Sequence, residues 1–389
     1  MAATAASSFS AAAAAAARRS SPSHLRLLAR RHLPFSSTVS FSAAAPPAAA
    51  ASFGWEDALR VAADDRRGDE SDLSGYFRKV DTCNRGMDKK GEFVEFMVED
   101  QVVGYIHQGF VEHLRDFHDV FTIASGSNGN NNVEHVTLHS SLRTPDERTN
   151  AVGSVIRSLG DLIPGIRNEL FPITSSYGMP VYFSLERAAA PFFGIKVLYV
   201  MYIWQAYGVH MNGYVEKESQ KFLWIAKRSD TKQTFPGMLD HLVAGGLPYG
   251  ISCEENVIKE CEEEAGIPRS ISSNATSVGA ISYMDIEGFR YKRDVLFCYD
   301  LKLPPDFVPN NEDGEVDSFR LIPVPHAANI IRRTHFFKPN CNLVIIDFLF
   351  RHGYHFLTCC LDNIPFRYIN PDYLGYLKLL QSLRRGDCS

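Results

Sequence analysis

Short apolar runs and segments of helical spacing follow one another in the first half of the chain. Apolar runs around a short polar turn predict paired β-strands at residues 93–98 and 101–106. Apolar side chains at helical spacing predict helices at residues 110–121 and 146–162. Together these elements predict a mixed α/β domain over residues 53–195.

The second half of the chain repeats the alternation with longer strands. Strand pairs are expected at residues 206–215 with 221–227 and at residues 277–284 with 291–303. Residues 317–324 predict a further strand, and residues 343–351 a helix with an apolar face. Residues 206–352 therefore predict an α/β sandwich. The tail at 353–389 is irregular except for residues 372–385, which favour a last helix.

The first 52 residues differ in composition from the rest of the chain. They are rich in Ala and Ser, carry several arginines and contain no acidic residue, the first being Glu56. Such a segment cannot bury enough apolar surface to offset its chain entropy. Its alanine run precedes Arg18 and Arg19, whereas a secretory signal places its charges first. We predict a disordered transit peptide, for the plastid stroma rather than the mitochondrion; an untargeted tail is the alternative.

Length, charge and cysteine content exclude several classes of protein. A chain of 389 residues is long enough for two domains or one large one. Its 40 basic and 45 acidic residues give a net charge of -5, which argues against nucleic-acid binding through bulk positive charge. The eight cysteines form no C-x-x-C pair and indicate reduced thiols in a non-secretory compartment.

One window requires a test for membrane insertion. Residues 188–208 are nearly apolar and long enough for a span of about 20 residues. Pro191, Lys196 and Gln205 interrupt the window, which favours a buried strand. We therefore expect no membrane partner.

The clearest single element is a helix predicted at residues 253–265. Ser252 with Glu255 three residues later has the spacing of a capping box. Gly266 is placed to end the helix, and Pro268 follows it. At 100° per residue, one face of this helix gathers small and apolar side chains: Val257, Ile258, Cys261 and Ala265.

An adjoining face of the same helix carries the carboxylates Glu260, Glu263 and Glu264. They repel one another at this spacing and lie near the helix C-terminus, where the dipole disfavours negative charge. A divalent cation removes both penalties, and oxygen ligands favour Mg²⁺ or Mn²⁺. A solvated acidic face is the alternative interpretation. The glycine-rich loop before the helix, with Gly245 and Gly246, favours a ligand site because its backbone can approach a ligand closely.

This segment resembles the Nudix box, G-x5-E-x7-R-E-U-x-E-E-x-G-U, in which U is a bulky aliphatic residue. The matching residues are Gly245, Glu260, Glu263, Glu264, Gly266 and Ile267. Ile251 stands where the family has Glu, Lys259 where it has Arg, and Cys261 where it has an aliphatic residue. Ile251 removes an accessory carboxylate, so the number or affinity of metal ions is expected to differ from the family pattern.

The resemblance extends over residues 60–352, which are similar to the chloroplastic Nudix hydrolases of plants. That subfamily has an N-terminal domain also found fused to fungal thiamin pyrophosphokinase. The stretches that carry this similarity are residues 182–187, 208–214 and 239–246. Residues 197–205 and 354–367 break it, and we hypothesise that they arise from alternative splicing or the choice of gene model. Transcript reads that contain both segments in most messages would end that hypothesis.

The resemblance implies a Nudix α/β/α sandwich with a mixed sheet, preceded by a smaller mixed α/β domain. It implies a metal-dependent hydrolase of diphosphate linkages, in which water attacks one phosphorus. Glu260 and Glu264 are then the primary metal ligands, and Glu263 is either a third ligand or the base that orients water. Lys259 orients a neighbouring carboxylate. A homodimer is common in the superfamily.

Substrate contacts are expected just before and within the box. Gly245 and Gly246 shape the loop that holds the glutamates, whereas Asp240 and His241 either face the substrate or serve as hydrogen-bonded structural groups. Resemblance offers two small-molecule substrate classes: nucleoside diphosphate derivatives, and thiamin diphosphate or its oxidised, damaged forms. Ile251 and Lys259 favour the alternative of a catalytically weak or inactive binding module. An isoprenyl diphosphate isomerase shares the fold, but the complete set of three glutamates argues for hydrolysis.

Overall fold

The computed structural model describes residues 53–63, 71–125, 133–174, 180–195, 207–232, 234–246, 251–352, 369 and 371–386. The predicted transit peptide at 1–52 and the two segments hypothesised to be insertions, 197–205 and 354–367, lie outside these residues. Among the described residues, no helix combines the length and the apolar character needed to cross a membrane.

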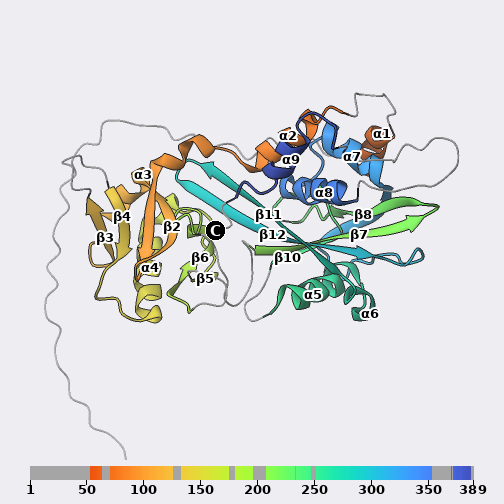
Figure 1. Ribbon diagram of the computed structural model, residues 1–389. Coiled ribbons are helices and arrows are strands. Elements are labelled where there is room, and N and C mark those ends of the chain that lie inside the picture. The colour runs from red at the N-terminus through yellow and green to blue at the C-terminus, as the bar shows by residue number, and fades with distance from the viewer. Residues whose placement is uncertain are drawn as a thin grey trace, which may run out of the picture. The chain divides into compact units, whose positions relative to one another are not determined.

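A mixed sheet forms the centre of the second half of the chain (Figure 1). Its strands are β7 (Tyr207–Lys217), β8 (Gln220–Arg228), β9 (Leu239–Asp240), β10 (Val243–Gly246), β11 (Thr276–Glu287), β12 (Arg290–Lys302) and β13 (Val316–Pro323). The order is β11-β12-β7-β8-β13, with β10 beside β7 and β9 beside β8. β7 runs antiparallel to β8 and parallel to β12, so the predicted mixed sheet is confirmed.

Helices cover both faces of this sheet (Figure 1). They are α5 (Cys253–Ala265) and α6 (Arg269–Ser272) on one face, and α7 (Val324–Arg333) and α8 (Pro339–Arg351) on the other. α5 buries Val257 and Cys261 against Val209 and Met211 of β7, because its apolar stripe recurs at helical spacing. The predicted α/β/α sandwich is confirmed, whereas α7 was not anticipated.

Three more helices pack on the layer formed by α7 and α8. They are α1 (Trp55–Ala62), α2 (Ser74–Cys83) and α9 (Tyr376–Ser382). Ala58 of α1, Tyr76 and Val80 of α2, and Leu379 of α9 lie in one hydrophobic cluster with α7 and α8. α9 lies inside the segment predicted to form a last helix, whereas α1 and α2 were not anticipated.

The first half of the chain forms a separate mixed sheet in the order β2-β1-β4-β3. Its strands are β1 (Phe93–Val98), β2 (Gln101–His107), β3 (Phe121–Ser125) and β4 (Val133–Leu138). α4 (Pro145–Leu159) packs against the short pair β5 (Leu170–Ile173) and β6 (Phe183–Glu186) and shares the core of the sheet. The predicted hairpin, the second predicted helix and the mixed α/β character are confirmed.

The helix predicted at residues 110–121 is wrong over its second half. α3 (Gln108–Val111) and a 3₁₀ turn at Glu112–Leu114 account for the helical part, and β3 begins at Phe121. The apolar spacing arises because Phe110, Val111 and Leu114 all enter the core of the sheet. Tight backbone turns at Phe117 then redirect the chain into the strand.

Candidate active site

Helix α5 begins and ends at the residues that the sequence predicts. The Ser252 hydroxyl accepts a hydrogen bond from the Glu255 backbone N–H at 3.1 Å. The Glu255 carboxylate is bound to Arg269 at 2.9 and 2.7 Å, so it does not supply the reciprocal half of a capping box. Gly266 ends the helix with φ of 60°, a left-handed conformation that strongly favours glycine.

The backbone of β10 fixes one carboxylate of this helix. The Ala244 N–H donates to Oε2 of Glu264 at 2.8 Å, which orients the carboxylate toward the end of the strand. The Asn256 side chain donates to the Gly246 carbonyl at 2.9 Å and ties the same strand to the first half of α5. Asn256 is fully buried and was not predicted from the sequence.

Glu260 lies directly against Gly245. A Cβ atom placed on Gly245 would be 2.0 Å from Cδ of Glu260, far inside van der Waals contact. Glycine is therefore required at this position for the carboxylate to sit where it does. The predicted role of Gly245 in shaping the site now has a steric cause.

Two acidic residues that sequence reasoning missed join the helix at this point. Oxygen atoms of Glu264, Asp313 and Glu315 lie within 4.8 Å of one another. Asp313 and Glu315 belong to the segment just before β13. The acidic run from Glu312 to Glu315 was the available signal, but only the tertiary fold brings it to α5.

The third carboxylate of the motif, Glu263, is not part of this acidic cluster. Its carboxylate accepts an ion-paired hydrogen bond from Nζ of Lys259 at 2.6 Å, and its side chain is 51% exposed. Nζ of Lys259 also lies 3.5 Å from Oε1 of Glu260, whose side chain is only 13% exposed. Lys259 thus bridges the exposed and the buried carboxylate of the box.

The buried carboxylates are short of positive charge. Burial, reinforced by Glu260, Asp240 and Glu315, raises the pKa of Glu264 well above its usual value. Burial also raises the pKa of Glu260, with Glu263 and Glu315 adding to the shift against the attraction of Lys259. Groups that resist ionisation in this way gain most from a bound cation.

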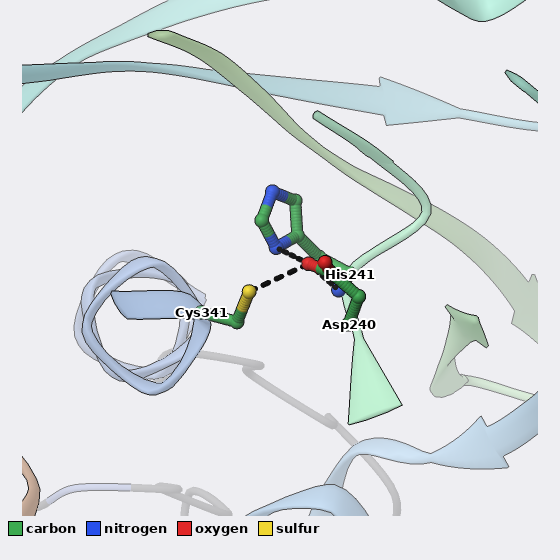
Figure 2. Close-up of side chains that lie close together, drawn as sticks. All are labelled: Asp240, His241 and Cys341. Atoms are coloured by element: carbon green, nitrogen blue, oxygen red, sulfur yellow. Dashed lines mark hydrogen bonds and ion pairs between the residues drawn. The ribbon is translucent and has the colours of Figure 1, made fainter. Parts of the chain in front are cut away.

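Asp240 and His241 lie at the end of β9 in a separate buried cluster with Cys341 of α8 (Figure 2). Sγ of Cys341 lies 2.6 Å and Nδ1 of His241 2.9 Å from Oδ1 of Asp240. Nε2 of His241 lies 2.8 Å from Nδ1 of His210. Figure 2 shows the Asp240 carboxylate pointing at both partners.

The other oxygen of Asp240 is occupied by cations. Arg228 donates to Oδ2 at 2.9 Å, and Nζ of Lys338 lies 3.5 Å away. Although burial opposes ionisation, Lys338, His241 and Arg228 hold the pKa of Asp240 well below its usual range. Two cations already neutralise this carboxylate, so a metal ion is disfavoured here and favoured at Glu264.

One cavity joins the two clusters. Its lining includes Arg228, Asp240, His241, Ala244, Glu264 and Glu315. The lining thus combines the carboxylates of Glu264 and Glu315 with the Arg228–Asp240 ion pair. The enclosed space is about 20 Å³, room for a single ion or water, so it suits a divalent cation to which an anionic ligand binds from outside. Carboxylates alone would repel that ligand.

Family comparisons match both halves of the chain. The NUDIX domain matches residues 207–339, which include α5 and the cavity. A domain of unknown function, DUF4743, matches residues 75–197.

Individual relatives extend this match along the chain. Nudix hydrolase 20, chloroplastic, of Arabidopsis thaliana is 54% identical over 359 residues, covering 92% of this chain and 89% of the relative. Nudix hydrolase 24, chloroplastic, of the same plant is 56% identical over 321 residues, covering 82% and 80%. An uncharacterized protein of Saccharomyces cerevisiae is 38% identical over 228 residues, covering 54% and 63%.

The chain therefore belongs to the Nudix hydrolase family, whose members act on anhydride bonds in phosphorus-containing compounds and generally use divalent metals. Within the family it is similar over most of its length to the two chloroplastic plant proteins. Their names confirm the predicted chloroplast localisation.

Proposed function

We propose that this protein hydrolyses a diphosphate linkage in a nucleoside diphosphate derivative or a thiamin diphosphate-type compound, oxidised forms included, and releases a monophosphate. The observation that supports it is the gathering of Glu264, Asp313 and Glu315 beside Glu260 at one end of α5. These oxygen donors fit Mg²⁺ or Mn²⁺. Such an ion supplies the positive charge that offsets the charge of the diphosphate.

The protein's own residues hold and orient the reactants. Ala244 fixes the Glu264 carboxylate, and Gly245 leaves room for Glu260. We assign Glu260 and Glu264 as primary ligands, with Asp313 and Glu315 as further donors. The base that accepts the proton of the attacking water is left to a loop outside α5, because the Glu315 carboxylate is ion-paired with Lys232. The role of Glu263 as a ligand or base rests on the family resemblance alone, because its carboxylate is paired with Lys259.

Asp240 and His241 act in this proposal from the cavity wall. Asp240 accepts a hydrogen bond from Arg228 and so keeps the Arg228 guanidinium at the cavity wall. Gly246 fixes the start of α5 by accepting from Asn256. We therefore propose that Asp240, Gly245 and Gly246 position the site, and that His241 forms part of the cavity wall.

The organisation of the chain belongs to the same proposal. Residues 1–52 act as the transit peptide into the plastid stroma, and 53–195 form an N-terminal domain whose first helices, α1 and α2, pack on the Nudix half. Residues 206–352 form the Nudix domain, and 353–389 form a tail whose helix α9 joins the same hydrophobic core. The substrate is a small molecule, and a homodimer is compatible with the family. No nucleic acid or membrane partner is proposed.

A panel of diphosphates tests the function directly. Protein beginning at residue 53 is given Mg²⁺ or Mn²⁺ with ADP-ribose, dinucleotides, coenzyme A, thiamin diphosphate or oxothiamin diphosphate, and products are detected by mass. A monophosphate is expected, and Glu264→Gln should reduce its rate about a hundredfold or more. Glu262→Gln on the exposed side of α5 is the matched control and should retain activity. Absence of any product from the folded wild type would support the binding module instead.

A further inference from the structure

The loop between β8 and β9, residues 229–238, is anchored to residues of the cavity; all of it except residue 233 is described. The Ser229 N–H donates to the Glu315 carbonyl at 2.9 Å, and Lys232 forms an ion pair with the Glu315 carboxylate. From the other side, Arg228 donates through Nη2 to the Thr234 carbonyl at 3.0 Å. Arg228 and Glu315 both line the cavity, so the loop is bonded to two of the residues that form its wall.

This loop holds Phe235 in an unfavourable backbone conformation. Its φ is 52°, a left-handed value that is an outlier for a bulky side chain. Nε of Arg228 donates to the Phe235 carbonyl at 3.1 Å and braces the strained backbone. The side chain is nevertheless 40% exposed, so hydrophobic burial does not explain the strain. Strain of this kind clusters at ligand clamps, where surrounding contacts impose it.

We propose that Phe235 is a stacking platform for an aromatic ring of the substrate, and so determines which diphosphates are bound. The inference deepens the proposed function and rests on it. Arg228 links the two parts of such a site, since one guanidinium holds both the cavity residue Asp240 and the backbone of Phe235. A diphosphate bound at the carboxylates would then extend its ring toward the loop.

The surroundings of Phe235 favour a ring over an aliphatic tail. Phe235 stands between the polar Thr234 and Pro236, and the nearby Lys232 and Arg228 are ion-paired with Glu315 and Asp240. A single aromatic face among polar groups suits a flat heterocycle, because stacking tolerates polar edges. A long hydrocarbon chain needs a larger continuous apolar surface than Phe235 and the adjacent Pro236 provide.

The first test compares kinetics for substrates with and without a ring. Phe235→Leu keeps apolar bulk but removes the aromatic face. It should raise KM for ADP-ribose or thiamin diphosphate by at least about fivefold, with little change in kcat. For geranyl diphosphate, which has no ring, the KM of Phe235→Leu should stay within about twofold of the wild-type value. Phe235→Tyr should restore the low KM, and Leu162→Ala, which removes a side chain of 39% exposure elsewhere, is the matched control.

A second test does not depend on turnover. Phe235→Trp places a fluorophore at the loop. The emission of the variant minus that of the wild type, which has the same other tryptophans, reports residue 235 alone. Its emission should be quenched by AMP or thiamin monophosphate but not by ribose 5-phosphate. Equal KM values for wild type and Phe235→Leu, or equal quenching by all three phosphates, would overturn the inference. If the wild type cleaves none of these compounds, the proposed function fails while the quenching still decides the role of Phe235.

Discussion

At the scale of single residues, the site depends on how closely a backbone and a carboxylate approach. Gly245 and Glu260 occupy neighbouring space that has no room for a further carbon atom. Elsewhere the constraint is one of charge. Asp240 is surrounded by Arg228 and Lys338 inside the protein. Both features are local, and each gives a prediction for one substitution.

Gly245→Ala should displace the Glu260 carboxylate, because the new Cβ would lie 2.0 Å from Cδ of Glu260. A shift of about 1 Å in a reacting group costs on the order of a hundredfold in rate, so kcat/KM should fall by at least about tenfold. Steady-state kinetics measures this. Gly91→Ala, where an added Cβ meets nothing within 4 Å, should behave as wild type. Full activity in Gly245→Ala would show that the position of Glu260 is not critical.

Asp240→Asn should destabilise the protein by up to about 3 kcal/mol, because the largely buried cations of Arg228 and Lys338 would lose their counter-charge. Urea unfolding gives the free energy of unfolding. Asp230→Asn, at a side chain that is 82% exposed, is the control and should change it little. A small change at Asp240 would mean that water reaches the two cations.

At the scale of elements, buried polar groups join segments distant in sequence. Lys79 of α2 donates to the Thr334 carbonyl and lies 3.1 Å from Nδ1 of His335. That segment continues to Phe336 and Lys338, whose backbone groups bond Leu239 of β9 at 2.8 and 2.9 Å. Lys79 therefore connects α2 to the strand that carries Asp240.

The pH dependence of stability should reveal this contact. Burial lowers the pKa of Lys79 from 10.5 to about 8 in the folded state. Below pH 8 the Lys79 amine is charged in both the folded and the unfolded protein, and burying that charge destabilises the folded state. This desolvation penalty disappears as pH rises from about 8 to 10.5, because the amine loses its proton. Lys79→Met should therefore stabilise the protein at pH 7, with a gain that shrinks toward pH 10. Thermal melts of wild type and Lys79→Met over a range of pH measure this difference in stability. Lys89→Met, at an exposed position, is the control. A stability gain in Lys79→Met that does not change with pH would contradict the prediction.

At the scale of the whole molecule, the outer helical layer of the sandwich draws on both ends of the chain. α1 and α2 precede the first sheet, and α9 follows the second, yet all three pack against α7 or α8 or on one another (Figure 1). The Phe53 ring stacks on Phe336 with centroids 4.0 Å apart. The NUDIX domain match begins only at residue 207, so it omits part of this core.

Removing residues 1–83 should therefore damage the Nudix half. Loss of α1 and α2 exposes the apolar faces of α7 and α8, including Ala327, Ile331 and Val344. We expect the shortened protein to aggregate or to melt without a cooperative transition, whereas protein beginning at residue 53 should melt cooperatively. Circular dichroism and size-exclusion chromatography distinguish the two. A cooperative melt of the shortened protein at an unchanged temperature would show that α7 and α8 do not need the cover.

The sequence by itself determined α5 and what it carries. Caps, apolar stripe and the spacing of Glu260 and Glu264 are all encoded within a few turns, so local rules suffice. The strand hairpins were predicted for the same reason. The helix at residues 110–121 was overpredicted, because apolar spacing alone does not distinguish a helix from turns that bury the same side chains.

Only the tertiary structure decided which carboxylates meet. Glu264 gathers with Asp313 and Glu315 because β13 brings its preceding segment beside α5, a long-range pairing that the acidic run itself does not reveal. Glu263, equal to its neighbours in the motif, turns outward to Lys259. The strained Phe235 is equally invisible in sequence, since its conformation is imposed by Arg228 through contacts that exist only after folding.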